Sequence, residues 1–190
     1  MAGAVANPHE PRDGAARTDL VAEIRRLEGE LRDVQRRLLA AGGQVIPGIH
    51  LVIETAGRRA LLSAAQVMEV VRMLATQPVP GAPAHVRGTF LCRGTPVVAV
   101  DLGKLLGETA EPGIDAQIVI LAGAPAVGLV VERVLRLVED PRLYEGAISA
   151  DAPTGFGDSR LTVGLCLDGQ EILPVLDASP IQAELAGRAA

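Results

Sequence analysis

Valine and isoleucine are concentrated in one part of this chain, and this distribution constrains the fold more than any other feature. Of the 31 such residues, 26 fall between Val45 and Asp177. β-Branched side chains favour the pleated surface of a sheet, and turns containing Gly or Pro divide the stretch into ten short runs. We therefore expect an all-β body of barrel or sandwich type. The expected strands are residues 49–54, 59–63, 67–74, 88–93, 97–101, 114–121, 126–131, 134–139, 161–167 and 171–177.

Four segments of the body carry more detailed predictions. Residues 97–100 are apolar without alternation, as in a strand that is buried on both faces and shared by two barrels. The prolines of residues 78–83 exclude a central strand, and Pro80 followed by Gly81 suits the middle of a type II turn. Asp101 is expected to cap one or two helical turns that end at Gly107. Residues 180–185 predict a short closing helix.

The first 43 residues follow a different pattern. Residues 1–17 are rich in Ala, Gly and Pro and predict a flexible tail. Residues 18–43 predict an amphipathic, coiled-coil type helix whose apolar side chains recur every four and three residues in turn. A helix of three heptads needs a partner, which is either a second chain or the body of its own chain. Its seam is Leu20, Ile24, Leu27, Leu31, Val34 and Leu38, and the flanking positions include Glu23, Glu28, Glu30 and Arg37.

Charge and composition exclude several classes of function. Residues 1–43 hold seven basic and seven acidic groups, so the net charge of −5 belongs to the body. An acidic body is a poor match for nucleic acid, and three aromatic residues are too few for a stacking platform. The sequence shows neither a signal peptide nor a membrane-spanning run, which predicts a cytoplasmic protein without direct membrane insertion.

The sequence contains no motif typical of catalysis, cofactor binding or metal binding. His9, His50 and His85 are not at ligand spacing to one another or to a cysteine. Cys92 and Cys166 lie in apolar runs, which is typical of free buried cysteines. Nucleophile, phosphate and dinucleotide fingerprints are absent. We therefore expect a binding protein that is not an enzyme; a small enzyme whose site is assembled from scattered acids is the least favoured alternative.

The stretch of residues 86–102 reads VRGTFLCRGTPVVAVDL. It contains two Arg-Gly pairs with four residues between them, followed by a Pro-Val pair and an Asp-Leu pair. This order is similar to the signature of CheW-like domains, the coupling proteins of bacterial chemotaxis. Residues 65–70, 78–83, 127–134 and 154–157 also resemble family segments, in family order. The resemblance covers about residues 47–180 and indicates a CheW-like domain over residues 46–187.

Three features depart from the family pattern. Leu91 and Cys92 stand where Asn and Leu are usual, and Glu132 replaces an Asp. Residues 158–164 resemble an insertion before the last hairpin.

The resemblance implies a mainly β fold of two intertwined five-stranded β-barrels, preceded by the heptad helix and followed by a short C-terminal helix. It also implies a non-catalytic adaptor that couples the cytoplasmic tip of a chemoreceptor to a CheA-type histidine kinase in signalling arrays at the membrane. In the family, a groove between the barrels holds the receptor. The matching positions here are Val67, Glu69, Gly88, Arg93, Gly128 and Gly155.

Glu69 is expected on the same strand face as Val67 and Val71, where an isolated charge needs a partner. The family pattern makes Arg93 that partner. The two residues then form either an ordinary surface ion pair or a partly buried pair that orients the barrels. The glycines are required either by turns alone or because they line the groove and allow a partner's backbone to approach.

An alternative function keeps the same fold. The chain would then be an accessory CheW-like adaptor of a non-flagellar chemosensory or motility system that self-associates as a homodimer through residues 20–38. Removal of residues 1–43 distinguishes the two functions, because only the accessory adaptor then changes both its oligomeric state and its partners.

Overall fold

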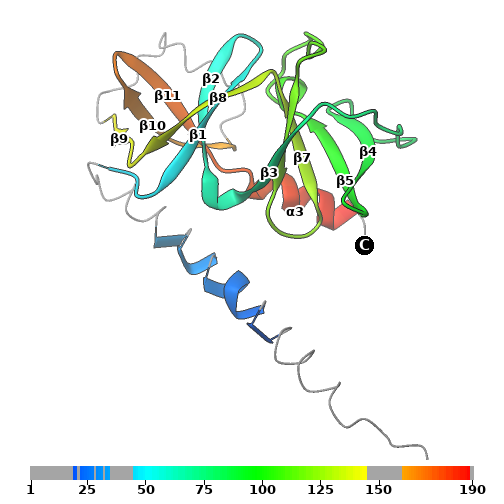
Figure 1. Ribbon diagram of the computed structural model, residues 1–190, viewed down its shortest axis with the longest axis horizontal. Helices are drawn as coiled ribbons and strands as arrows, with labels where there is room; N and C mark the ends of the chain where they lie inside the picture. Colours follow the sequence, from blue (N-terminus) through cyan, green and yellow to red (C-terminus); the bar gives the residue numbers. More distant parts are fainter. Residues whose placement is uncertain are drawn as a thin grey trace, which may run out of the picture. The chain divides into compact units, whose positions relative to one another are not determined.

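The computed structural model of the chain describes residues 19–20, 22–27, 29–31, 33–34, 45–144 and 160–188. The chain separates into two units, residues 1–37 and 38–190. The described part of the second unit is built mainly from strands (Figure 1). In chain order its elements are β1 (Ile49–Thr55), β2 (Arg58–Ser63), η1 (Ala64–Gln66), β3 (Val67–Arg72), β4 (Val86–Cys92), β5 (Thr95–Asp101), α2 (Leu102–Leu105), β6 (Gln117–Leu121), β7 (Val127–Val131), β8 (Arg133–Glu139), β9 (Arg142–Leu143), β10 (Thr162–Asp168), β11 (Glu171–Leu176) and α3 (Ser179–Arg188).

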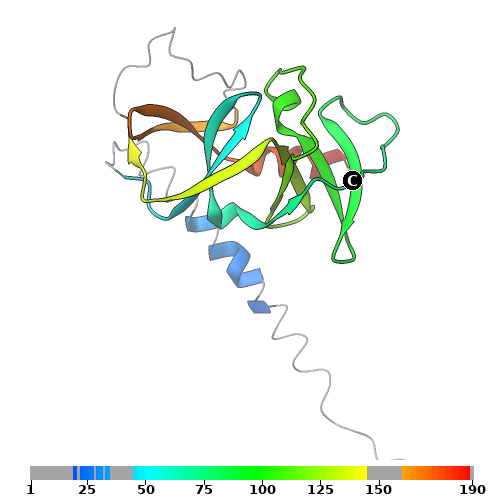
Figure 2. The same cartoon turned by 45° about the horizontal axis from the view of Figure 1, so that its top comes forward.

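The strands form two sheets, which lie side by side in Figures 1 and 2. In hydrogen-bonding order these are β8-β1-β2-β11-β10-β9 and β3-β6-β7-β5-β4. Neighbouring strands are antiparallel, except for the parallel pairs β2–β11 and β5–β7. The first sheet thus brings the two ends of the body together, because β2 follows soon after its start and β11 lies close to its end.

All ten predicted strands are present, but the prediction of two five-stranded barrels is only partly confirmed. The additional strand β9 has two residues, too few for a recognisable alternation, and it makes the first sheet six-stranded. Among the described residues, neither sheet has a backbone ladder that joins its two end strands. The fold is therefore mainly β with two sheets of six and five strands, closed by the C-terminal helix α3.

Apolar side chains gather in three buried clusters. Because successive side chains of a strand point to opposite faces, strands such as β1 and β6 contribute to two clusters each. The six-stranded sheet has its own cluster around Val52, Leu61, Cys166 and Leu173. The five-stranded sheet has another, which we call the small core: Phe90, Val97, Ala99, Ala116, Ile118, Ile120 and Val130. The largest, the shared core, includes Leu51, Ile53 and Leu62 from the first sheet and Val100, Val119 and Leu129 from the second.

Three local predictions are confirmed. In β5, Val97 belongs to the small core and Val100 to the shared core, so this strand is a wall between them. The residue pair Pro80 and Gly81 forms a turn in which the amide of Ala82 donates to the carbonyl of Val79 at 3.2 Å. Asp101 caps α2, since its carboxylate accepts a hydrogen bond from the backbone amide of Lys104 at 3.1 Å.

The first unit, described by itself, is helical at every described position from 19 to 34. Its five described seam side chains, Leu20, Ile24, Leu27, Leu31 and Val34, are between 50 and 64% exposed. On its polar side, Arg26 forms ion pairs with Glu23 and Glu30, one turn before and after it. The sixth seam residue, Leu38, and the predicted tail of residues 1–17 lie outside the described residues. In the part of the chain that the structure describes, no helix is long and apolar enough to span a membrane.

Candidate functional site

Three side chains meet at one end of the five-stranded sheet. The Glu69 carboxylate accepts hydrogen bonds from the Cys92 thiol at 3.1 Å and from Nε of Arg93 at 3.1 Å. A second guanidinium nitrogen of Arg93 lies 3.0 Å from the same carboxylate oxygen. The predicted pairing of Glu69 with Arg93 is therefore confirmed, and Cys92 is an additional donor that the sequence did not indicate. We call these three residues the carboxylate cluster.

The carboxylate cluster joins the two end strands of one sheet. Glu69 lies on β3 and Cys92 on β4, which are the first and last strands in the order β3-β6-β7-β5-β4. Side-chain bonds thus link the two strands without a backbone ladder between them. Glu69 lies on β3 and Arg93 in the turn between β4 and β5, so the ion pair links two ends of the five-stranded sheet and does not orient one barrel on the other.

The turn between β4 and β5 determines where the Arg93 side chain lies. Cys92 pairs with Thr95, which leaves a two-residue loop of Arg93 and Gly94. Both have positive φ, 50° and 82°, as a type I′ hairpin turn requires. Arg93 is a costly residue in that conformation, and its side chain is 83% exposed, whereas that of Glu69 is 20% exposed. The guanidinium therefore offers most of its surface to solvent or a partner while it still contacts Glu69.

The cluster has a defined protonation state at neutral pH. The hydrogen bond from Cys92, and then the one from Arg93, lower the pKa of the Glu69 carboxyl. The same carboxylate raises the pKa of the Cys92 thiol. Glu69 is therefore ionised and Cys92 is a protonated thiol that donates. Cys92 is half-buried, so the prediction of a buried cysteine is wrong for it but confirmed for Cys166, whose burial raises its pKa to about 12.

Val67 lies on the same strand as Glu69 but faces the other way. A β-bulge shifts the register of β3 against β6 between these two residues. As a result Val67 packs against the shared core, while Val71, two residues beyond Glu69, packs against the small core. The sequence predicted that the three residues share one face, which is wrong for Val67 because the bulge inserts Met68 into the alternation. Val67 is half-buried, so part of its side chain is still exposed on the five-stranded sheet.

Gly88 is required by a contact within the chain. It is buried, its φ is +138°, and a β-carbon there would lie 2.2 Å from the carbonyl oxygen of Gln77. The Gln77 carbonyl accepts a hydrogen bond from the amide of Thr89 at 2.8 Å. The Gln77 amide donates a hydrogen bond to the carbonyl of Thr89, also at 2.8 Å. The backbone that approaches Gly88 is thus the segment leading into the proline loop, residues 78–83.

Gly128 is also enclosed by its own chain. A β-carbon at this position of β7 would lie 2.5 Å from Cγ2 of Ile118 and 3.3 Å from Cγ1 of Val97, both in the small core. Space inside the core therefore requires glycine here. The third glycine of the predicted groove, Gly155, lies outside the described residues. The structure brings Glu69 and Arg93 together and gives Gly88 and Gly128 packing roles in the same sheet.

The signature stretch also contains an ion pair that the sequence did not indicate. The Arg87 guanidinium donates to the Asp101 carboxylate at 3.0 Å and to Glu111 at 2.7 Å. Asp101 is 2% exposed, and its other oxygen caps α2 through the Lys104 amide. One buried carboxylate thus ties the start of β4 to the end of β5 and to α2. The first Arg-Gly pair and the Asp-Leu pair of the signature are explained by this contact and by the packing of Gly88.

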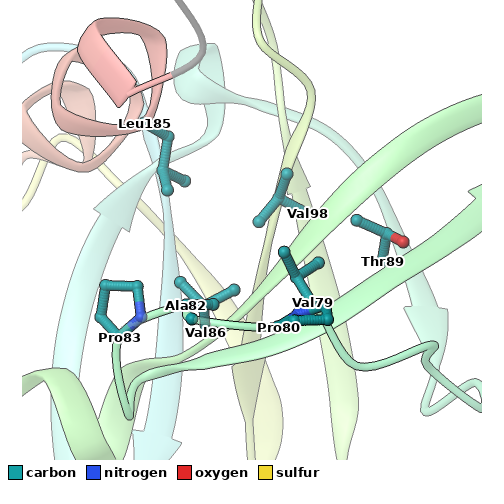
Figure 3. A pocket seen from close by; sticks show the side chains of 9 residues that line it. Val79, Pro80, Ala82, Pro83, Val86, Thr89, Val98 and Leu185 are labelled. Atoms are coloured by element: carbon teal, nitrogen blue, oxygen red, sulfur yellow. The ribbon is translucent and has the colours of Figure 1, made fainter.

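An open apolar pocket of about 470 Å³ lies between the proline loop, β4, β5 and α3. Figure 3 shows Leu185 of α3 across the opening from Pro83, Ala82 and Val86 of the loop and β4. Val86, Val98 and Leu185 also pack against the shared core, so the pocket is the place where that core reaches the surface. The sequence predicted the loop but not the pocket, because the pocket depends on where α3 packs. Within the described ranges, no group of three His, Cys, Asp or Glu side chains could hold a metal ion.

Comparison with known proteins identifies a family. The family model described as "CheW-like domain" matches residues 50–185. Fifteen chains of solved structures match this chain. Among them is the scaffolding protein TtCheW from Thermoanaerobacter tengcongensis, with 22% sequence identity and a TM-score of 0.58. That match covers 69% of this chain and 84% of the other, and at this identity it establishes a common fold. No curated protein matches the chain.

Proposed function

Because the chain belongs to the family of CheW-like domain proteins, a family of non-catalytic scaffolding domains, we propose that it is the adaptor that couples chemoreceptors to a CheA-type histidine kinase. The family match spans both sheets and the helix that closes them, so the proposal concerns the whole body. In this function the protein acts in the cytoplasm and is recruited to receptor arrays at the membrane.

The carboxylate cluster is the observation that carries the proposal. Its ion pair occupies two of the six positions that the family resemblance assigns to receptor binding, Glu69 and Arg93. The arrangement suits recognition of a helix, because Arg93 presents a mostly exposed cation in a fixed turn conformation and Leu91, close by on β4, is 70% exposed. We propose that Glu69 and Arg93 contact the receptor tip, and that Val67, which packs against the shared core on the other face, belongs to the receptor-binding groove on the basis of the resemblance alone.

The glycines have a different part in the proposal. Gly88 and Gly128 shape the receptor-binding sheet, since their neighbours are groups of the same chain. Gly88 positions the proline loop and Gly128 permits the close packing of β7 against β5 and β6. Gly155 keeps its place in the proposed receptor-binding groove on the basis of the resemblance alone.

Co-sedimentation with receptor-containing membranes, with and without the kinase, tests the proposal. We expect the wild-type chain to sediment with receptor membranes and to increase the amount of kinase that sediments with them. Arg93→Ala should weaken receptor retention, because it removes the exposed cation and the ion pair to Glu69. Arg59→Ala is the matched control: Arg59 pairs with Glu171 on the six-stranded sheet, and its loss should leave retention unchanged.

The outcomes separate the possibilities. If the wild-type chain binds neither receptor membranes nor the kinase, the proposed coupling function is refuted. If receptor membranes retain Arg93→Ala and the wild type equally, the carboxylate cluster is not part of the surface that binds the receptor.

The accessory adaptor is the second candidate function, and the separate N-terminal unit with its exposed seam favours it. It requires that deletion of residues 1–43 changes both the oligomeric state of the chain and the partners that it binds.

A further inference from the structure

The chain crosses between the two sheets twice. The turn η1 leads from β2 of the six-stranded sheet to β3 of the five-stranded sheet, and Glu132 leads back from β7 to β8. At the second crossing, the side chain of Gln117 accepts a hydrogen bond from the amide of Val134 at 2.6 Å. At the first crossing, the side chain of Gln66, the last residue of η1, bonds to the residues where α3 begins. The first crossing is therefore tied to an element that lies more than 100 residues further along the chain.

Gln66 uses both ends of its side-chain amide. Its Nε2 atom donates a hydrogen bond at 2.7 Å to Oδ1 of Asp177, which directly follows β11 of the six-stranded sheet. Its Oε1 atom accepts one from the backbone amide of Ala178 at 3.2 Å. The same Asp177 oxygen accepts a hydrogen bond from the amide of Ser179, the first residue of α3, at 2.9 Å. Because hydrogen bonds are directional, Gln66 fixes the start of α3 on the crossing between the sheets.

Gln182 fixes α3 on the five-stranded sheet. Its Nε2 atom donates to the carbonyl oxygen of Ala122 at 3.0 Å and lies 3.4 Å from that of Pro125. Both carbonyls belong to the turn between β6 and β7. The amide of Ala122 in turn donates to the backbone carbonyl of Gln66 at 2.8 Å. The hydrogen bonds thus form a closed circuit through η1, the β6–β7 turn and α3, and we call Gln66 and Gln182 with these partners the glutamine clamp.

Apolar packing holds α3 mainly at its first turns. Ile181 is buried in the shared core, whereas Leu185, one turn further along, borders the open pocket between α3 and the proline loop. Apolar contacts are also non-directional, so they favour burial of α3 without fixing its exact place across the two sheets. The directional contacts come from the glutamine clamp.

We propose that Gln66 and Gln182 are positioning residues for the receptor-binding groove, because they fix the five-stranded sheet against the six-stranded sheet through α3. Val67 follows Gln66 directly, and Glu69 lies two residues further along β3. A change at the clamp therefore reaches the groove along a single strand. The contribution to receptor binding rests on the proposed function, whereas the fixing of the two sheets does not.

Gln66→Met and Gln182→Met, alone and together, test the clamp, because methionine keeps the length of the side chain and loses its hydrogen bonds. Gln170→Met is the matched control, since Gln170 is exposed in the turn between β10 and β11. Residual dipolar couplings of the backbone amides, fitted separately for each sheet, measure whether the two sheets keep one relative orientation. We expect one common alignment tensor for the wild type and the control, and two different tensors for the double variant. A common tensor in the double variant would refute the clamp; if urea unfolding shows that the double variant is not folded, the two single variants are measured in its place.

Co-sedimentation with receptor membranes tests the consequence for binding. If about a tenth of the molecules keep the orientation that binds, the apparent dissociation constant rises about tenfold. We therefore expect about tenfold weaker binding of the double variant and unchanged binding of Gln170→Met. Equal binding of the double variant and the wild type would refute the positioning role. A wild type that binds no receptor membranes would refute the coupling function alone, since the comparison of tensors still decides whether the clamp fixes the sheets.

Discussion

Gly88→Ala tests the contact that positions the proline loop on β4. The new β-carbon would lie 2.2 Å from the carbonyl oxygen and 2.7 Å from the carbonyl carbon of Gln77. Both are backbone atoms, so no side chain can rotate away to relieve the overlap. The segment before the proline loop has to move away from β4, and the two 2.8 Å hydrogen bonds between Gln77 and Thr89 are lost.

The expected cost follows from these contacts. Two backbone hydrogen bonds contribute about 2 kcal/mol together. Alanine at a φ of +138° adds about 2 kcal/mol of backbone strain. The free energy of unfolding should therefore fall by about 4 kcal/mol, a large part of the roughly 5–15 kcal/mol that is typical of a domain.

Urea unfolding of a series of glycine variants separates the two contributions. Gly113 has open space around it and no positive φ, so Gly113→Ala should change the free energy of unfolding by less than about 1 kcal/mol. Gly81 has open space but a φ of +72°, so Gly81→Ala should lower it by about 1 kcal/mol. In Gly88→Ala, hydrogen exchange at the amides of Gln77 and Thr89 should also accelerate. If Gly88→Ala costs no more than Gly81→Ala, or if both amides stay protected, the packing explanation for Gly88 is wrong.

Three further predictions concern buried or partnered charges. Asp101→Ala removes the cap of α2 and a buried ion-pair partner, so urea unfolding should show a loss of about 2–4 kcal/mol, while exposed Asp115→Ala should be neutral. Burial lowers the pKa of His50, so the unfolded chain binds the proton more readily and stability should fall as pH drops below about 6.5. His50→Gln should flatten that slope in unfolding experiments at about pH 5–7, and an unchanged slope would contradict the assignment. Glu69→Gln removes the carboxylate that raises the pKa of Cys92, so alkylation of Cys92 near pH 8 should accelerate; equal rates would argue against the 3.1 Å hydrogen bond.

Much of the fold could be predicted because its strands are encoded locally. Alternating and continuous apolar runs located all ten expected strands, and turn residues such as Pro80 and Gly81 located a loop. The six-stranded sheet was missed because β9 has only two residues. A bulge at Met68 reversed the face expected for Val67, and nothing in the pattern of β3 marks it, since half-buried and exposed residues still alternate there.

The candidate site was predictable only in part. An acidic residue on an apolar strand face needs a partner, and the resemblance to CheW-like domains named Arg93 as the partner of Glu69. The reasons for Gly88 and Gly128 could not be predicted, because they depend on atoms of Gln77 and Ile118 that approach only in the folded chain. The buried ion pair of Arg87 with Asp101 was missed for the same reason: fourteen residues separate them, and only the pairing of β4 with β5 brings them together.

The parallel pairing of β2 with β11 has a consequence for the order of folding. In the five-stranded sheet, Arg87 meets Asp101 across 14 residues and Glu69 meets Arg93 across 24, so these contacts close short loops. Beside the β2–β11 pair, Gln66 meets Asp177 across 111 residues, and closing that loop costs about 2 kcal/mol more in chain entropy than closing one of 14. We expect the β4–β5 region to form early and the six-stranded sheet to be completed last. On the ribosome, the edge of β2 that pairs with β11 then stays open until β11 has been synthesised, which leaves β2 exposed to chaperones and proteases during synthesis.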